Sequence, residues 1–211
     1  MTYSNWKVRA VAAAPLLIAF TIVPVVHSDD VGGGSGSSGN QAPVIVSLTA
    51  VQVPGKKFRI SGRVADETPA SCGVVISGAA SGVTLCDANG NFDAIYDVAT
   101  PGDITAIAGD GQLSSTPVGL TLGNAAPTTT IRAVRSGGQW TFSGTVTDEA
   151  PAGLTVTLSG APGLNGRTAT VAADGTWSIT LILFSQAQGI ANATVTDWYG
   201  LTGRASTPFG S

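Results

Sequence analysis

Acidic side chains recur at matching places in the chain, and they are the strongest candidates for chemistry. Each half of the sequence has an opening asparagine, an Asp-Glu pair followed by a proline, and a later aspartate shortly before a glycine. Calcium binds several oxygens at once, often carboxylates together with an asparagine carbonyl. The sequence therefore offers these candidate calcium ligands: Asn40, Asp66, Glu67, Asp110, Asn124, Asp148, Glu149 and Asp197.

The same acids have a second interpretation, which is structural. Asp66 and Asp148 are typical turn residues, whose carboxylates accept hydrogen bonds from nearby backbone N–H groups. Pro69 and Pro151 follow closely and favour a turn at both places. The sequence leaves both interpretations open, and calcium is the one cofactor it raises.

Other catalytic arrangements are missing from the sequence. His27 is the single histidine, so a serine or cysteine nucleophile has no histidine base within the repeats. Asp66 and Glu67 are adjacent, and adjacent strand residues point to opposite faces. The charge of −3 and the absence of a basic stripe argue against nucleic-acid binding. We expect a protein that is not an enzyme.

Cys72 and Cys86 are the two cysteines of the chain. Alignment of the two halves places them opposite Leu154 and Val171, which are apolar and typical of a core. In an exported protein such a pair indicates a structural disulfide, because the compartment is oxidising. The alternative is two separate buried thiols.

Trp198 and Tyr199 are candidates for ligand binding. They lie in a turn where the first half of the chain has Gly111 and Gln112. Exposed loop aromatics can stack on sugar rings or anchor a protein partner. The alternative is a turn aromatic that folds back over the end of its own domain. By contrast, Trp140 and Trp177 align with Phe58 and Phe92 and are predicted to lie in the core.

These residues are carried by an internal duplication. SGRVADETPAS (61–71) matches SGTVTDEAPAG (143–153), and ANGNF (88–92) matches ADGTW (173–177), about 85 residues apart. Alternation of apolar and polar residues predicts about seven strands per copy, and Asn89-Gly90 predicts a hairpin. The expected strands are 44–50, 58–64, 74–77, 83–86, 92–98, 104–108 and 113–122, then 129–134, 140–146, 155–159, 167–171, 177–183, 191–196 and 201–207.

The shared motifs resemble tandem bacterial immunoglobulin-like repeats of the cadherin and fibronectin type III kind. The resemblance is carried by N-x-A-P at positions 40–43 and 124–127, by SGxVxDExPA, and by the turn before the fifth strand. It implies an all-β chain of two tandem immunoglobulin-like sandwiches, with adhesion, spacer or carbohydrate-associated roles and no catalysis. It also implies calcium at module junctions, although cadherin linkers carry further aspartates that are missing here.

The N-terminal segment predicts export. Residues 1–28 have the cations and apolar core of a signal peptide, and residues 10–26 could alternatively remain as a membrane anchor. Residues 29–40 form a flexible Gly/Ser linker, followed by repeat one at 41–123 and repeat two at 124–211. We expect a secreted or cell-surface protein that touches membrane through the N-terminal segment alone.

The expected function is non-catalytic structural or adhesive display. Two alternatives stay open: a glycan-binding accessory protein that uses Trp198 and Tyr199, and a calcium-stabilised adhesion module. The expected partners are a cell-surface protein or a polysaccharide.

Overall fold

The structure is a computed structural model that describes residues 39–184 and 186–210. The signal or anchor segment 1–28 and nearly all of the 29–40 linker lie outside these residues. Within the described ranges, no helix has the length and apolar character needed to cross a membrane.

Repeat one is an all-β sandwich. Its seven strands are β1 (Val44–Val53), β2 (Lys57–Ala65), β3 (Gly73–Gly78), β4 (Gly82–Leu85), β5 (Asn91–Asp97), β6 (Asp103–Gly109) and β7 (Val118–Thr121). A short 3₁₀ turn, η1 (Pro69–Ser71), separates β2 from β3. One sheet has the order β1-β2-β5, and the other has the order β4-β3-β6-β7.

Repeat two has the same topology. Its strands are β8 (Thr128–Thr129), β9 (Arg132–Ser136), β10 (Gln139–Thr147), β11 (Thr155–Ser159), β12 (Thr168–Thr170), β13 (Thr176–Ile182), β14 (Gly189–Thr196) and β15 (Thr202–Phe209). Strands β8 and β9 both pair with β10, which also pairs with β13, and the second sheet is β12-β11-β14-β15. This arrangement of two antiparallel sheets is the immunoglobulin-like sandwich that the duplication predicts.

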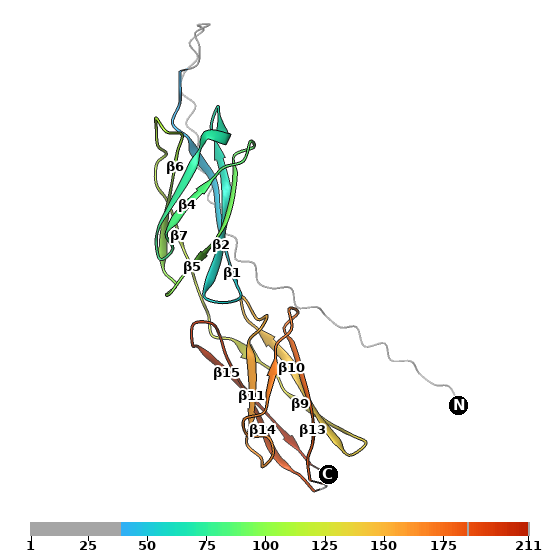
Figure 1. Cartoon of the computed structure of the whole chain (residues 1–211). Coiled ribbons are helices and arrows are strands. Elements are labelled where there is room, and N and C mark those ends of the chain that lie inside the picture. Colours follow the sequence, from blue (N-terminus) through green and yellow to red (C-terminus); the bar gives the residue numbers. More distant parts are fainter. Residues whose placement is uncertain (1–38, 185, 211) are drawn as a thin grey trace, which may run out of the picture.

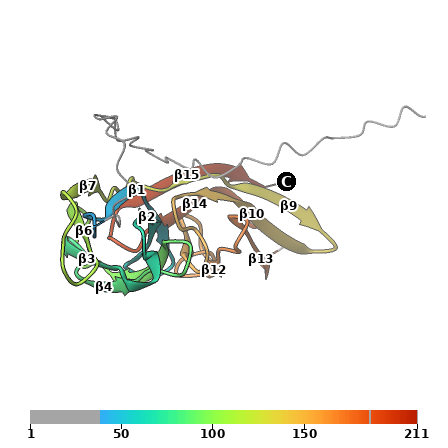
Figure 2. The ribbon, with the colours of Figure 1, turned by 90° about the horizontal axis from the view of Figure 1, so that it is seen from above.

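The two sandwiches follow one another end to end, with the described N-terminal residues at the far end of repeat one (Figure 1). Seen from above, repeat two is offset to one side of repeat one (Figure 2). Every strand pairing among the described residues joins strands of the same copy, and each copy has its own cluster of buried apolar side chains.

The alternation of apolar and charged residues along β2 explains how the core of repeat one forms. Phe58, Ile60 and Val64 are almost completely buried, whereas Lys57, Arg59 and Arg63 face solvent, as predicted. Arg59 forms an ion pair with Asp93 on β5 at the outer surface. The basic residues of this strand are therefore its solvent side.

A glycine in the second strand of each copy permits a close approach of the first strand. A Cβ on Gly62 would lie 2.1 Å from the Ser47 carbonyl oxygen, and one on Gly144 would lie 2.0 Å from that of Thr130. The aromatic rings of Phe92 and Trp177 cover these two glycines. Gly62 and Gly144 are thus strand glycines that allow a neighbouring backbone to approach closely.

Two sequence-based expectations are wrong. The turn at Asn89-Gly90 does have a positive φ of 79° at Gly90, but β4 and β5, which it joins, belong to different sheets. The turn is therefore a crossover between sheets, held by a hydrogen bond from the Val64 N–H to the Gly90 carbonyl. The single strand expected at 129–134 is split into β8 and β9, because the backbone beside Gly144 leaves the ladder at Thr130 and Ile131.

Candidate functional site

The acidic loop of repeat one holds the chain where it enters the sandwich. The Asn40 side-chain N–H donates to Asp110 Oδ2 at 2.8 Å, and the Gln41 backbone N–H donates to Glu67 Oε1 at 2.7 Å. Asp66 accepts the Thr68 backbone N–H at 2.8 Å and so shapes the loop itself. We call this set of contacts the entry latch.

Repeat two repeats the entry latch atom for atom. The Asn124 side-chain N–H donates to Asp197 Oδ2 at 2.7 Å, and the Ala125 N–H donates to Glu149 Oε1 at 3.1 Å. Asp148 Oδ1 accepts the Ala150 N–H at 2.8 Å. The shared N-x-A-P and DExPA motifs are thus the two sides of one contact.

The later aspartate of each latch also builds its own turn. Asp197 Oδ1 accepts the backbone N–H groups of Tyr199 and Leu201 at 2.9 and 2.7 Å. Asp110 Oδ1 accepts those of two residues in the equivalent turn, both at 2.7 Å. These bonds to Leu113 and Gln112, with the contact from Asn40, lower the pKa of Asp110. Asp197 is 6% exposed, whereas Asp110 is only half-buried.

Asp148 has the opposite electrostatic character. Burial raises its pKa, and the nearby carboxylates of Glu149 and Asp197 raise it further, against the lowering effect of the Ala150 N–H. Its Oδ2 atom is buried and has no hydrogen-bond partner, and the same is true of Asp66 Oδ2 and Asn124 Oδ1. The latch therefore contains oxygens that the protein itself leaves unpaired.

The predicted calcium ligands are brought together in two sets, one at the entrance of each copy. Within the described ranges no group of three or more His, Cys, Asp or Glu side chains is arranged to hold a metal ion. One oxygen of Asp66, Asp110, Asp148 and Asp197 instead accepts backbone N–H groups, which is the structural interpretation of these acids. Calcium binding stays a prediction.

Cys72 and Cys86 lie side by side as buried free thiols. The Cys86 N–H donates to the Cys72 carbonyl at 3.0 Å, as the Val171 N–H donates to that of Leu154 at 2.8 Å. Burial raises the pKa of the Cys72 thiol to about 11, and the charge of Asp66 adds to this. The alignment with two core residues is correct, and the disulfide stays a prediction.

Trp198 and Tyr199 are half-buried, and of the two interpretations the structure has the turn aromatic that folds back. The Trp198 Nε1–H donates to the Ala150 carbonyl at 2.9 Å, and its ring lies 3.6 Å from where a Cβ on Gly153 would be. The indole thus folds back over the end of repeat two. Ligand binding by these two residues stays a prediction.

The side chain of Tyr199, in repeat two, contacts repeat one. Its ring centroid lies 6.4 Å from that of Phe58, and Lys56 Nζ lies 6.0 Å from the Tyr199 centroid, in cation–π range. The Tyr199 side chain packs against the core of repeat one. Sequence reasoning missed this joint, although the signal was present: the aromatic residue is found at the end of repeat two that faces another module.

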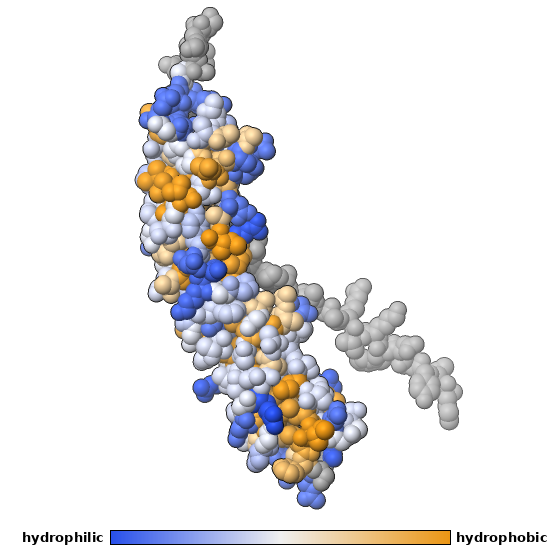
Figure 3. Space-filling view, viewed as in Figure 1, coloured by the Kyte–Doolittle hydropathy of each residue, from blue (hydrophilic) through white to orange (hydrophobic). Residues whose placement is uncertain are grey.

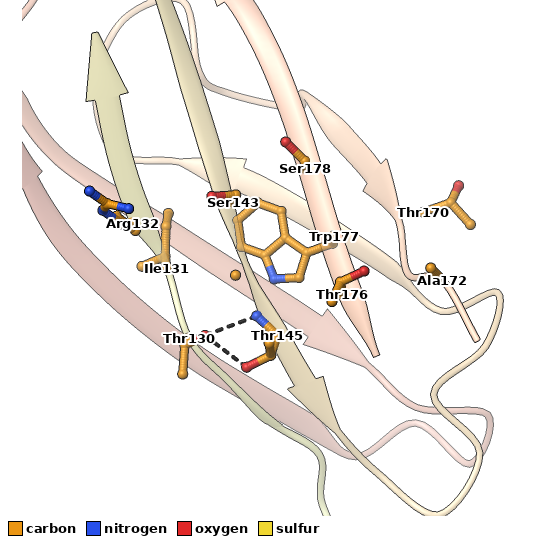
Figure 4. A pocket seen from close by; sticks show the side chains of 11 residues that line it. Thr130, Ile131, Arg132, Ser143, Thr145, Thr170, Ala172, Thr176, Trp177 and Ser178 are labelled. Carbon is orange, nitrogen blue, oxygen red and sulfur yellow. Dashed lines mark hydrogen bonds between the residues drawn. The ribbon is translucent and has the colours of Figure 1, made fainter. Parts of the chain in front are cut away.

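A shallow groove marks the break between β8 and β9 (Figure 4). Threonine and serine hydroxyls line it, and Thr130 and Thr145 are hydrogen-bonded to one another at 3.0 Å. Trp177 lies at its floor but is only 3% exposed, because its ring belongs to the core as predicted. The groove therefore presents no aromatic face for stacking.

No protein-family model matches the chain, and no curated protein matches it. Among solved structures it is similar to the adhesin InvE of Yersinia pseudotuberculosis, with 13% identity, a TM-score of 0.33, and coverage of 84% of this chain and 62% of that one. It is similar to Bacteroides uniformis beta-glucuronidase 3, with 14% identity, a TM-score of 0.27, and coverage of 83% and 25%. A fragment of intimin, solved in complex with the intimin-binding domain of its translocated receptor, has 14% identity, a TM-score of 0.31, and coverage of 79% and 64%.

The chain spans less than two-thirds of the length of each of these structures. At these identities and TM-scores the likeness carries no weight for activity, so the classification rests on strand order and on the repeated latch. The chain is a tandem immunoglobulin-like protein in which each module binds its own entering segment.

Proposed function

We propose that the chain is an exported, non-catalytic display module that holds two immunoglobulin-like domains end to end for adhesion or spacing outside the cell. The single observation that carries the proposal is the joint between the copies. There the entry latch of Asn124 and Asp197 fixes the connecting segment, and Tyr199 packs against Phe58. A joint held at two places keeps the second module at a defined distance from the first.

The chemistry of the acidic residues supports a structural role. Their carboxylates accept backbone N–H groups or the side chain of the entering asparagine. The glycan-binding alternative has less support, because Trp198 donates to Ala150 and Tyr199 lies in the joint. The partner of a display module of this kind would be a cell-surface protein or a polysaccharide.

Surface proteolysis of intact producing cells tests the location, and adhesion of protein-coated beads tests the role. We expect protease added outside the cell to remove the protein, and we expect coated beads to bind surfaces that carry proteins or polysaccharides. A matched bead coated with the Tyr199→Ala variant shows whether the joint contributes. Protection of the protein inside intact cells, or coated beads that bind no better than bare beads, would overturn the proposal.

A further inference from the structure

Repeat one has an exposed apolar face on its four-stranded sheet. Val75 on β3 is 49% exposed, and Val83 and Leu85 on β4 are 66% and 75% exposed. Val75 lies directly opposite Val83 on one side and Ile107 of β6 on the other. Figure 3 shows hydrophobic side chains gathered on this side of the repeat.

These side chains form one surface. Leu85 lies opposite Gly73, which has no side chain to separate it from Val83. A Cβ on Gly73 would lie 3.6 Å from Leu85 Cδ2 and 3.9 Å from Val83 Cγ1. We call the surface made by Val75, Val83, Leu85 and Ile107 the apolar face.

Repeat two shows that the fold does not require this face. Its equivalent sheet has the same register, with Thr157 opposite Thr168 and Thr194, and Thr155 opposite Thr170. Every member of the apolar face therefore has a threonine at the matching position, namely Thr157, Thr168, Thr170 and Thr194. An apolar surface that is present in one copy and replaced by hydroxyls in the other indicates a binding role rather than a folding role.

The charge pattern favours a partner with the same surface. The other outer face of repeat one carries the ion pairs Arg59–Asp93 and Lys57–Asp97. Strands β3 and β4 contain no ionisable residue, and the one on β6 is Asp103 at the first position of the strand. Two copies can therefore approach through this face without repulsion, whereas a charged partner would meet no complementary charge.

Strand β4 is also an unprotected edge. Within the described residues it pairs with β3 alone, and it lacks the lysine, proline or bulge with which edge strands discourage association. This leaves the border of the apolar face open to the approach of a second sheet.

We propose that the apolar face is the contact surface between two copies of this chain, whose four-stranded sheets pack face to face about a two-fold axis. The four strands β3, β4, β6 and β7 hold 6, 4, 7 and 4 residues, so at about 4.8 Å between strands and about 3.3 Å per residue they cover roughly 330 Å² per copy. The total of roughly 660 Å² lies below the area of a stable dimer, so the contact can only be weak and transient. The contact therefore forms at high protein concentration, as when many copies are displayed on one surface.

Analytical ultracentrifugation of the protein up to submillimolar concentration tests this inference. We expect the weight-average mass to rise with concentration toward that of a dimer. The double variant Val83→Thr, Leu85→Thr places threonine where repeat two has Thr168 and Thr170. It should keep the melting temperature of the unaltered protein, while its self-association weakens by about tenfold or more. Phe184→Ser, at an 82% exposed site in repeat two, is the control and should associate as the unaltered protein does.

Two results would overturn the inference. A protein that stays monomeric at submillimolar concentration has no such contact. Self-association that survives in the double threonine variant, or that disappears in Phe184→Ser, would place the contact elsewhere on the molecule. The melting temperature of each variant, measured in the same buffer, separates a lost contact from a lost fold.

Discussion

Replacement of Asp197 by alanine should destabilise repeat two strongly. The carboxylate is 6% exposed and accepts three hydrogen bonds, from the Tyr199 and Leu201 backbone N–H groups and from Asn124 Nδ2. Each donor left buried without a partner costs about 1–3 kcal/mol. Because the three bonds belong to one side chain and are not additive, we expect a total loss of about 3–4 kcal/mol.

A loss of this size is a large share of the stability of a small module, which is on the order of 5–15 kcal/mol. At about 4–8 °C per kcal/mol for a domain of this length, the melting temperature of repeat two should fall by about 12–32 °C. Calorimetry of the whole chain can follow the two modules as separate transitions.

Matched variants distinguish the latch from a general effect of losing an acid. Asp110→Ala removes the equivalent carboxylate of repeat one, which is half-buried and so less shielded from water than Asp197, and the transition of repeat one should therefore shift less. Asp197→Asn keeps one oxygen acceptor for the turn and should be milder than Asp197→Ala. A shift in Asp197→Ala no larger than that in Asp110→Ala would refute the reasoning.

Five further predictions concern individual residues or residue pairs. Burial raises the pKa of Asp148 above its unfolded value, so the stability that this acid contributes is present below the unfolded pKa and is lost as pH rises through the folded pKa. The variant Asp148→Asn should therefore have a higher melting temperature than the unaltered protein at neutral pH. A lower melting temperature would contradict this. The calcium prediction requires millimolar calcium to raise the melting temperature of the unaltered protein but not of Asp148→Asn, and no shift would contradict it. Mass spectrometry of protein purified without reductant should show a disulfide between Cys72 and Cys86, and reduction should lower the free energy of unfolding by about 2–4 kcal/mol. Two thiols that react with an alkylating agent would show that the disulfide does not form. Gln52 is 5% exposed, and its side-chain amide has no hydrogen-bond partner within the described residues. The variant Gln52→Met should therefore stabilise repeat one by about 1–3 kcal/mol. A destabilised variant would show that the amide does form hydrogen bonds. Trp198→Ala should lower the melting temperature of repeat two, and lost glycan-array binding without such a change would instead favour the glycan-binding alternative.

The strand pattern could be predicted from the sequence because period-two alternation reports which side of a strand is buried. Phe58, Ile60 and Val64 are buried as expected, and Thr155–Ser159 is a strand with the predicted bounds. The errors have local causes. The Asn89-Gly90 pattern specifies a backbone conformation, and it does not specify which sheet the next strand joins. The break at Thr130 depends on the distant Gly144, which strand propensity does not register.

The candidate site was harder to predict because its contacts join residues far apart in the sequence. The acids and the two asparagines were identified from their repetition, and a structural role was one of two interpretations. The sequence could not pair Asn40 with Asp110, which are 70 positions apart. Nor could it show that Tyr199 would meet Phe58, because the aromatic residue belongs to one module and its contact belongs to the other.

The central claim is that the entry latch and Tyr199 join the two modules into one stiff unit. Backbone ¹⁵N relaxation of the protein measures it directly, because tumbling times can be derived separately for repeat one and repeat two. The account predicts that amides of both repeats fit one shared, elongated rotor, and that Tyr199→Ala loosens it. Separate, shorter tumbling times for the two repeats in the unaltered protein would contradict the account.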